Sequence, residues 1–293
     1  SNVSGTWTQI GADIDGEART NRSGYSVSLS RDGGSVAIGA PFNGGNGYSS
    51  GSVRVYKNIS GTWIQVGNDI DGEAEDDESG RSVSISADGT VVAIGAPDND
   101  GRGFFAGSVR VYKNVFGVWT QIGADIDGEA ESDESGTSIS LSDDGSVLAI
   151  GSLFNDGSGL SAAGSVRVYK NVLGSWTQIG ADIDGEEVGE CFGVRVSLSS
   201  DGSILAVGAH QFYTGLTNAG LVRIYKNVSD TWIQIGATIY GEAIGDNSGD
   251  SISLSGDGKR IAIGAPYNDD NGEYSGSVRV YDLSGILSSD IFV

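Results

Sequence analysis

Apolar and polar residues alternate over short stretches of the chain with a period of two. In residues 82–86, for example, serines alternate with Val83 and Ile85, and the turn pair Asp88-Gly89 follows closely. Stretches of this kind, rich in β-branched and aromatic residues and bounded by turn residues, are typical of β-strands joined by tight hairpins. No helical period of about 3.6 residues extends over a useful length, so the pattern predicts an all-β protein.

The whole pattern returns about every 56 residues. One tryptophan marks each copy, and the steps between them are 56, 56, 57 and 56 residues: Trp7, Trp63, Trp119, Trp176 and Trp232. Each unit carries four predicted strands, which in the second unit span residues 82–86, 91–96, 108–112 and 119–122. Four antiparallel strands in a repeated unit of this size form the blade of a β-propeller. We therefore predict that residues 1–293 form a single domain, a five-bladed β-propeller with four antiparallel strands per blade.

The two ends of the chain decide how the predicted ring closes. The chain starts with a predicted fourth strand around Trp7 and ends with a predicted third strand around Tyr281. The fifth blade lacks its outermost strand unless the opening segment supplies it, and such pairing removes two exposed sheet edges. We therefore predict closure by the N-terminal strand. The tail, residues 286–293, competes for the same edge or could pair with a neighbouring molecule, which would be a route to self-assembly.

The two faces of each predicted sheet differ in bulk. In residues 91–96, Val92 and Ile94 lie on one side, and Ala93 and Gly95 lie on the other. The bulky face of one blade packed against the small-residue face of the next gives close, dry contact, so we expect stacked blades. We interpret the arginines that recur once per unit as structural partners for carboxylates: Arg54, Arg110, Arg167, Arg223 and Arg279.

Charge and composition exclude several classes of function. Lys plus Arg number 17 and Asp plus Glu number 39, so the net charge is 17 − 39 = −22. Nucleic acids and anionic membrane surfaces both require clustered positive charge, so neither is an expected partner. No apolar run approaches the roughly 18 residues of a membrane span, so we expect no direct membrane insertion. One cysteine, Cys191, and one histidine, His210, leave no internal disulfide and no multi-histidine metal centre, and we expect Cys191 to be buried.

The run from Ser79 to Pro97, Ser-Gly-x-Ser-Val-Ser-Ile-Ser-x-Asp-Gly-x-x-Val-Ala-Ile-Gly-Ala-Pro, resembles the FG-GAP repeat of integrin-α-like β-propellers. The fourth unit carries the literal Phe192-Gly193, and three units carry the Gly-Ala-Pro. The resemblance covers all five units and implies the propeller fold. Because members of this family are mostly adhesion or surface-binding modules, it also implies a secreted protein that works at a cell surface.

The family often holds Ca²⁺ in an aspartate-rich loop between the first two strands of a blade. In this chain Ser28 and Ser30 occupy two of the matching positions, the loop is one residue shorter, and the last aspartate is missing. Hydroxyl groups are poor substitutes for carboxylates around a hard cation. We therefore predict that this calcium site of the family is absent.

A different acidic motif precedes the first strand of each blade. Four units read Asp-x-Asp-Gly-Glu, and a further acidic or amide residue stands three positions before the glycine that opens the strand. Closely spaced carboxylates around a glycine turn suit Ca²⁺, which takes about six to eight oxygen ligands. The alternative is a solvated turn whose aspartates cap backbone amides, and both interpretations stay open. The candidate ligands for Ca²⁺, the one cofactor that the sequence suggests, are Asp13, Asp15, Glu17, Asp69, Asp71, Glu73, Asp77, Asp125, Asp127, Glu129, Asp133, Asp182, Asp184 and Glu186.

The longest connections, those between the second and third strands, are expected on the same face as the acidic turns. They are rich in Asn, Asp, Gly and aromatic residues, as in residues 42–50 and 98–106, and such a face suits a protein or glycan ligand. We therefore predict a non-enzymatic binding or adhesion module, located outside the cell or on its surface. An architectural subunit of a filament or larger complex is the alternative.

A carboxylate-dependent hydrolase or lyase is the third hypothesis. It requires a non-repeated pair of acids near the axis of the ring, and the sequence offers none that stands out. One variable position would set specificity if it lay at the mouth of the central channel, because the residue after the strand glycine differs in every unit. The five residues are Tyr25, Arg81, Thr137, Val194 and Asp250.

Overall fold

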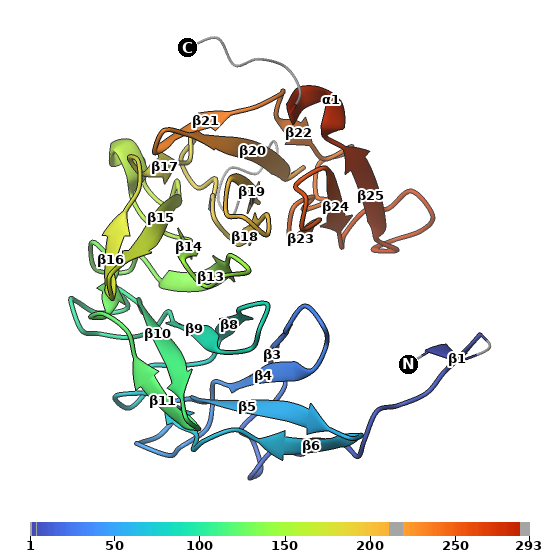
Figure 1. Cartoon of the computed structure of the whole chain (residues 1–293). Helices are drawn as coiled ribbons and strands as arrows, with labels where there is room; N and C mark the ends of the chain where they lie inside the picture. The colour runs from blue at the N-terminus through green and yellow to red at the C-terminus, as the bar shows by residue number, and fades with distance from the viewer. Residues whose placement is uncertain (1, 4, 211–218, 288–293) are drawn as a thin grey trace.

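The structure, a computed structural model, describes residues 2–3, 5–210 and 219–287. Nearly all of its regular structure is β-strand, and the strands form five successive sheets around a common centre (Figure 1). We call these sheets blades 1 to 5 in chain order. The prediction of an all-β, five-bladed propeller is confirmed.

Strands within a blade are antiparallel, and consecutive strands are neighbours. Blade 1 contains β3 (Ser26–Leu29), β4 (Ser35–Ala40), β5 (Ser52–Ile59) and β6 (Thr62–Gln65). Blade 2 contains β8 (Ser82–Ile85), β9 (Val91–Ala96), β10 (Ser108–Val115) and β11 (Val118–Gln121). Blade 3 contains β13 (Ser135–Leu141), β14 (Val147–Ser152), β15 (Ser165–Val172) and β16 (Ser175–Gln178). Blade 4 contains β18 (Arg195–Leu198), β19 (Ile204–Ala209), β20 (Leu221–Val228) and β21 (Thr231–Gln234), and blade 5 contains β23 (Ser251–Leu254), β24 (Arg260–Ala265) and β25 (Ser277–Asp282).

A short extra strand follows each of blades 1 to 4 and pairs with the third strand of that blade. These two-residue strands are β7 (Ile70–Asp71), β12 (Ile126–Asp127), β17 (Ile183–Asp184) and β22 (Ile239–Tyr240). They belong to the acidic motif, so the turns that carry the candidate carboxylates are fixed to the blade by backbone pairing. The described helical segments are the 3₁₀ turn η1 (Gly157–Gly159) and α1 (Ser284–Leu287), and neither is long and apolar enough to cross a membrane.

Adjacent blades pack a bulky face on a small-residue face, as predicted. Between blades 1 and 2, Val92 and Ile94 of blade 2 share one buried cluster with Val53 of blade 1. The approach is so close that a Cβ atom added to Gly39 would lie 2.0 Å from the carbonyl oxygen of Gly80 in the next blade. Only glycine permits this contact between backbones. The junctions are therefore specified by glycine on one side and by branched side chains on the other.

Tryptophans of the outermost strands fasten blades 2 to 4 to the blade before them, and the tryptophan of blade 1 is fastened to the opening segment. The indole Nε1 of Trp119 donates to the carbonyl oxygen of Val66 at 2.7 Å. The same bond recurs from Trp63 to Ile10, from Trp176 to Ile122 and from Trp232 to Ile179. The repeat of about 56 residues thus places one equivalent anchor in each of blades 1 to 4.

The structure does not show the predicted closure by the N-terminal strand. The opening segment pairs with itself, β1 (Asn2–Val3) with β2 (Thr6–Trp7), and blade 5 has three strands among the described residues. Trp7 is 82% exposed. The slot beside Gly236, where the pattern would place an indole, is filled by Ile286 of α1, which lies 2.8 Å from a Cβ added to that glycine. The tail therefore covers this apolar site in place of Trp7, and residues 288–293 of the tail lie outside the described residues.

Candidate active site at the mouth of the central channel

The innermost strands of the five blades surround a cavity of about 650 Å³. Its lining includes the residue that follows the strand glycine in every unit: Tyr25, Arg81, Thr137, Val194 and Asp250. These variable positions therefore do meet at the central channel, as the sequence hypothesis required. The five units place five different side chains at this mouth, so the units differ most from one another here.

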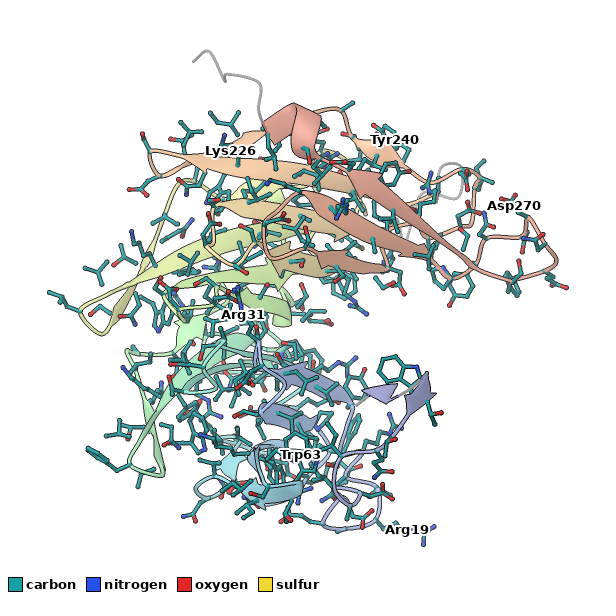
Figure 2. All side chains as sticks on the ribbon, turned by 45° about the vertical axis from the view of Figure 1, so that its right-hand side comes forward. Arg19, Arg31, Trp63, Lys226, Tyr240 and Asp270 are labelled. Carbon is teal, nitrogen blue, oxygen red and sulfur yellow. The ribbon has the colours of Figure 1, made fainter. Side chains whose placement is uncertain are left out.

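A second cavity is lined by residues at and near the turns between the first and second strands of the five blades, and it includes Arg31, which Figure 2 labels. This residue lies in the turn between β3 and β4, and its guanidinium forms an ion pair with Asp143 of blade 3. It also donates to the hydroxyl of Ser200 in blade 4. We therefore place the entrance to the cavity at the other face, where the long connections between second and third strands begin.

Two acids lie in connections on the face of this entrance, Asp98 and Glu134; neither lines the cavity itself, and Glu134 lines a separate cavity together with Phe105 and Phe154. Asp98 is the second residue after the end of β9, and the described equivalent residues are aromatic, Phe42, Phe154 and Tyr267. Glu134 precedes the serine and glycine that begin β13, and it lies half-buried next to the channel-lining strands. The backbone at this second position is left-handed in every unit, with φ between +50° and +54°. Because the equivalent residues Arg22, Glu78, Cys191 and Asn247 share this conformation, it is a feature of the repeat and does not single out Glu134.

The two carboxyl groups titrate far from their ordinary values. Burial, followed by the negative charge of Glu78, raises the pKa of Asp98 to about 6. Burial, followed by the negative charge of Asp98, raises the pKa of Glu134 to about 7. The charge of Asp98 thus acts on the pKa of Glu134, and the charges of Glu78 and Arg81 act on the pKa values of both acids.

Arg81 connects this pair to the cavity. Its guanidinium lines the cavity, forms an ion pair with Glu78, and lies over the ring of Tyr25 with 5.4 Å to the ring centroid. Its positive charge lowers the pKa values of Asp98 and Glu134 and so opposes the effect of burial. Arg81 is therefore near both acids, and it is the one basic side chain that acts on both of them.

This arrangement can perform acid–base chemistry near neutral pH. At pH 7 a carboxyl group with a pKa of about 6 is mostly ionised, whereas one with a pKa of about 7 is half protonated. One group can then accept a proton while the other donates one, and the best catalytic pKa lies near the working pH. Coupled carboxyl groups with separated pKa values are a recognised signature of such sites.

A histidine and an aspartate occupy the far side of the same cavity. His210 Nδ1 lies 3.6 Å from Asp250 Oδ1, and both residues line the cavity. Burial lowers the pKa of His210, although the charge of Asp250 opposes this shift, so the imidazole is neutral at pH 7.

Cys191 is fully buried in an apolar cluster with Leu153 and Val194, as predicted. The wall between blades 3 and 4 is therefore apolar, in contrast to the acidic side.

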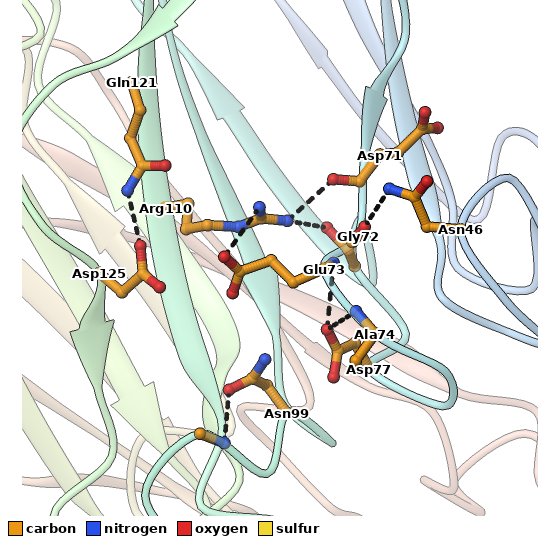
Figure 3. A network of polar contacts seen from close by, with 12 residues as sticks. Asn46, Asp71, Gly72, Glu73, Ala74, Asp77, Asn99, Arg110, Gln121 and Asp125 are labelled. Atoms are coloured by element: carbon orange, nitrogen blue, oxygen red, sulfur yellow. Dashed lines mark hydrogen bonds and ion pairs between the residues drawn. The ribbon is translucent and has the colours of Figure 1, made fainter.

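The acidic turns that the sequence suggested for Ca²⁺ lie farther out, between neighbouring blades (Figure 3). In the second unit the carboxylate of Asp77 accepts from the backbone N–H groups of Glu73 and Ala74, at 3.2 and 2.8 Å. Arg110 donates to the carbonyl oxygen of Asp71 at 3.0 Å, and its Nη1 lies 3.6 Å from Glu73 Oε1. Much of the oxygen set is therefore engaged in holding the turn and Arg110, which lies in the third strand of blade 2.

The same contacts recur around the ring. The first aspartate of the motif accepts from a glutamine four residues earlier, in the pairs Gln9–Asp13, Gln65–Asp69, Gln121–Asp125 and Gln178–Asp182. Asp133 caps its turn as Asp77 does. Burial raises the pKa of Asp71, Glu73, Asp127 and Glu129. Across the described parts of the chain, no three His, Cys, Asp or Glu side chains come together in a position to hold a metal ion, and Ca²⁺ at these turns stays a prediction.

Comparison with known proteins supports the fold and one repeat family. Residues 241–281 match the model of the FG-GAP repeat. No curated protein matches the chain significantly. Among solved structures, a Bacteroides uniformis protein assigned as a 6-phosphogluconolactonase is 15% identical with a TM-score of 0.56, and the match covers 87% of this chain and 71% of that one.

Two further structures are similar to a comparable degree. The periplasmic gluconolactonase of Pseudomonas aeruginosa is 16% identical with a TM-score of 0.55, and the match covers 87% of this chain and 71% of that one. An Agrobacterium tumefaciens protein assigned as TolB is 14% identical with a TM-score of 0.50, covering 89% of this chain and 77% of that one. At these identities the likeness shows a shared fold.

These findings overturn the prediction of a non-enzymatic binding or adhesion module, together with its architectural alternative. That prediction relied on a fold associated with adhesion and on the apparent lack of a non-repeated acid pair near the axis. Two of the similar propellers are named as gluconolactonases, so the fold no longer favours a non-enzyme. Asp98 and Glu134 form the acid pair that the sequence analysis did not find.

The pair was missed because its two members lie 134 − 98 = 36 residues apart and in different types of connection. Each looks like an ordinary surface acid when the chain is read along its length. Aligning the five units would have given a signal, since an acid stands at position 98 where the described equivalents are aromatic.

Proposed function

We propose that this chain, a member of the FG-GAP β-propeller family, is a hydrolase whose acid–base pair is Asp98 and Glu134. One observation carries the proposal: two half-buried carboxyl groups with pKa values of about 6 and about 7 lie within electrostatic reach of each other and of Arg81, which lines the channel cavity. An ordinary surface acid titrates near pH 4 and could not exchange protons efficiently at neutral pH.

A neutral sugar lactone is the first substrate class to test. Two propellers of the same fold are named as gluconolactonases, which supports a cyclic ester as the reacting group. Glu78 forms an ion pair with the cavity-lining Arg81, Asp98 and Glu134 lie within electrostatic reach of that arginine, and the whole chain has a net charge of −22, so a phosphorylated substrate would be repelled. Tyr25 and Tyr267 line the cavity and offer apolar ring faces to a sugar. We therefore expect an uncharged lactone to be preferred over its phosphorylated counterpart.

Asp98, Arg81 and Glu134 would each have one role in the reaction. Ionised Asp98 accepts a proton from a water molecule as the water oxygen attacks the carbonyl carbon of the lactone. Negative charge develops on the carbonyl oxygen, where the guanidinium of Arg81 would stabilise it. The bond between that carbon and the ring oxygen then breaks, and protonated Glu134 gives its proton to the departing oxygen. The product is a hydroxy acid, and a proton moving from Asp98 to Glu134 restores the pair.

A location outside the cytoplasm fits this proposal. One of the similar propellers is named as periplasmic. The chain has one cysteine and therefore no internal disulfide, so it requires neither an oxidising nor a reducing compartment. The strongly acidic composition favours solubility both inside and outside the cytoplasm.

The test compares lactone hydrolysis by the native chain and by Asp98→Asn and Glu134→Gln variants. Each variant keeps the shape of the side chain but removes one proton transfer, so we expect kcat/KM to fall by about 10²–10⁴-fold. Asp230→Asn, on an exposed turn at the rim of the ring, is the matched control and should keep full activity. Hydrolysis that survives in both channel variants, or a native chain inactive on neutral and phosphorylated lactones alike, would overturn the proposal.

A further inference from the structure

Two hairpins end in fully exposed, bulky apolar side chains. Phe116 lies at the tip of the hairpin between β10 and β11, and Leu173 lies at the tip of the hairpin between β15 and β16. Their relative exposures are 104% and 102%, so no other described residue covers them. The equivalent tips of blades 1 and 4 carry Ser60 and Ser229. Blades 2 and 3 thus depart from the repeat in the same direction, at a cost in solubility.

The backbone at both tips adds to this cost. Phe116 has a φ of +53° and Leu173 has a φ of +52°, in the left-handed region that bulky side chains rarely adopt. Beside them, Val115, Val118 and Val172 are 45%, 62% and 50% exposed. Exposed apolar side chains that are gathered in this way indicate a surface that contacts a partner.

Both tips project from the same end of the propeller. Each hairpin is joined to the turn between the first and second strands of its own blade, as in blade 2, where the N–H of Asn114 donates to the carbonyl oxygen of Thr90 at 2.8 Å. The bond recurs in blades 1, 3 and 4. In Figure 2 the hairpins extend to the left, whereas Asp270, in one of the long connections, lies on the right. We call the end formed by these turns and hairpins the hairpin end.

The hairpin end carries no net charge. Its nine connections hold 7 basic and 7 acidic residues, so their net charge is 7 − 7 = 0. The rest of the chain holds the other 10 basic and 32 acidic residues, and 10 − 32 = −22 is the whole net charge of the protein. The connections counted are residues 30–35, 57–62, 86–91, 113–118, 142–147, 170–175, 199–204, 226–231 and 255–260. A neutral end with apolar tips thus lies opposite an acidic one.

The shape and charge of the hairpin end indicate the class of partner. Side chains at two separate hairpin tips are convex, so a protein partner would need a matched pocket for each, whereas the headgroup layer of a bilayer adapts to inserted apolar side chains. The charge of −22 on the rest of the chain opposes an anionic bilayer, and a zwitterionic bilayer imposes no such cost. Lys113 and Lys170 are exposed, three positions before the apolar tips, where their ammonium groups would meet lipid phosphates.

We propose that the hairpin end rests on a zwitterionic phospholipid surface, with Phe116 and Leu173 inserted into the headgroup layer. The contact needs neither a membrane-spanning segment nor clustered positive charge. The entrance to the cavity would then face away from the lipid and toward the aqueous phase. This inference is independent of the proposed hydrolase, because Asp98 and Glu134 lie in connections at the opposite end.

The experiment sediments the full chain with vesicles made of phosphatidylcholine alone, at physiological ionic strength. The test variant is Phe116→Ser/Leu173→Ser, which restores the residue found in blades 1 and 4. We expect its bound fraction to fall roughly tenfold or more, since each tip loses an apolar side chain that lipid would bury. The matched control, Tyr48→Ser/Ile244→Ser, removes two side chains that are 74% and 69% exposed at the opposite end, and it should bind as the native chain does. Circular dichroism checks the fold of both variants.

A dye attached at one tip tests the contact itself. Phe116→Cys is labelled with an environment-sensitive nitrobenzoxadiazole dye, whose emission should rise and shift to shorter wavelength when phosphatidylcholine vesicles are added. The same dye on Tyr48→Cys should not respond. The native chain, whose Cys191 is fully buried, reports the background of labelling.

Three results would overturn the proposal. They are a native chain that stays in solution with phosphatidylcholine vesicles, equal binding by the native chain and the Phe116→Ser/Leu173→Ser variant, and tighter binding to vesicles that contain phosphatidylserine than to phosphatidylcholine alone. A protein captured by the native chain and not by that variant, without any binding to vesicles, would assign the two tips to a protein partner instead.

Discussion

At the scale of single residues, the chemistry that we propose relies on departures from the repeat. The recurring arginines have a structural role, as predicted, although their partners are largely backbone carbonyl oxygens, as in Arg110 and Asp71. The buried position of Cys191 was also predictable, because a lone cysteine behaves as a small apolar residue. The acid pair was not, because a pKa depends on burial and on charges from distant turns. Asp98 and Glu134 acquire their properties only when blades 2 and 3 come together.

The raised pKa of Glu134 makes a stability prediction. Its pKa is about 7 in the folded state against an ordinary value of 4.5, so the folded state binds more protons between these values. The free energy of unfolding should therefore fall as pH rises from about 4.5 to about 7. Glu134→Gln removes the ionisable group and should stabilise the protein at pH 8 by about 1–3 kcal/mol, with the difference vanishing at pH 4. Urea unfolding at both pH values measures this.

The control for that prediction is Asp230→Asn, which should leave the pH dependence of stability unchanged. Equal unfolding free energies of the native chain and Glu134→Gln at pH 8 would show that the carboxyl group of Glu134 titrates normally, and the assignment of the pair would then fail.

At the scale of elements, alternation located the strands well. The predicted stretch 91–96 coincides with β9, and 82–86 exceeds β8 by one residue. The third strand extends three residues beyond the predicted end at residue 112, because Lys113 to Val115 pair with β11. The two-residue strands such as β7 and the helix α1 were not predicted, since neither has room for a periodic pattern. The sequence also left the role of Asp77 undecided between a metal ligand and a cap of the turn. In the structure its carboxylate caps backbone amides.

Because neighbouring blades approach closely at a glycine, we predict that alanine lowers the stability of the protein more at Gly95 than at Gly264. Gly95→Ala places a methyl group 2.2 Å from the backbone oxygen of Gly136, which neither blade can avoid without moving. We expect it to lower the free energy of unfolding by about 1–3 kcal/mol or more. Gly264→Ala meets mainly the rotatable hydroxyl of Ser251 and should cost less than about 1 kcal/mol in the monomer.

Thermal and urea unfolding of both glycine variants at low protein concentration provide the measurement. Equal losses at the two positions would mean that the strand itself, and not the neighbouring blade, requires glycine. The account of the junctions between neighbouring blades would then be wrong.

At the scale of the whole molecule, the number of blades could be predicted and the closure of the ring could not. Five units follow from counting Trp7 and its four equivalents. Closure depends on which apolar segment of the chain packs into the site beside Gly236. The alternation of apolar and polar residues does not show which segment binds there most favourably. Ile286 fills the slot beside Gly236 while Trp7 stays exposed. The face that carries the site was anticipated, because strand parity places the long connections together, but the prediction of what happens there was wrong.

The most direct test of the account is the pH dependence of lactone hydrolysis by the native chain. Activity requires ionised Asp98 and protonated Glu134, so kcat/KM should follow a bell with limbs near pH 6 and pH 7. Asp98→Asn and Glu134→Gln should each abolish the bell along with the activity. A profile that rises steadily with pH as the uncatalysed reaction does, or a bell that both variants retain, would contradict the claim that this pair performs the chemistry.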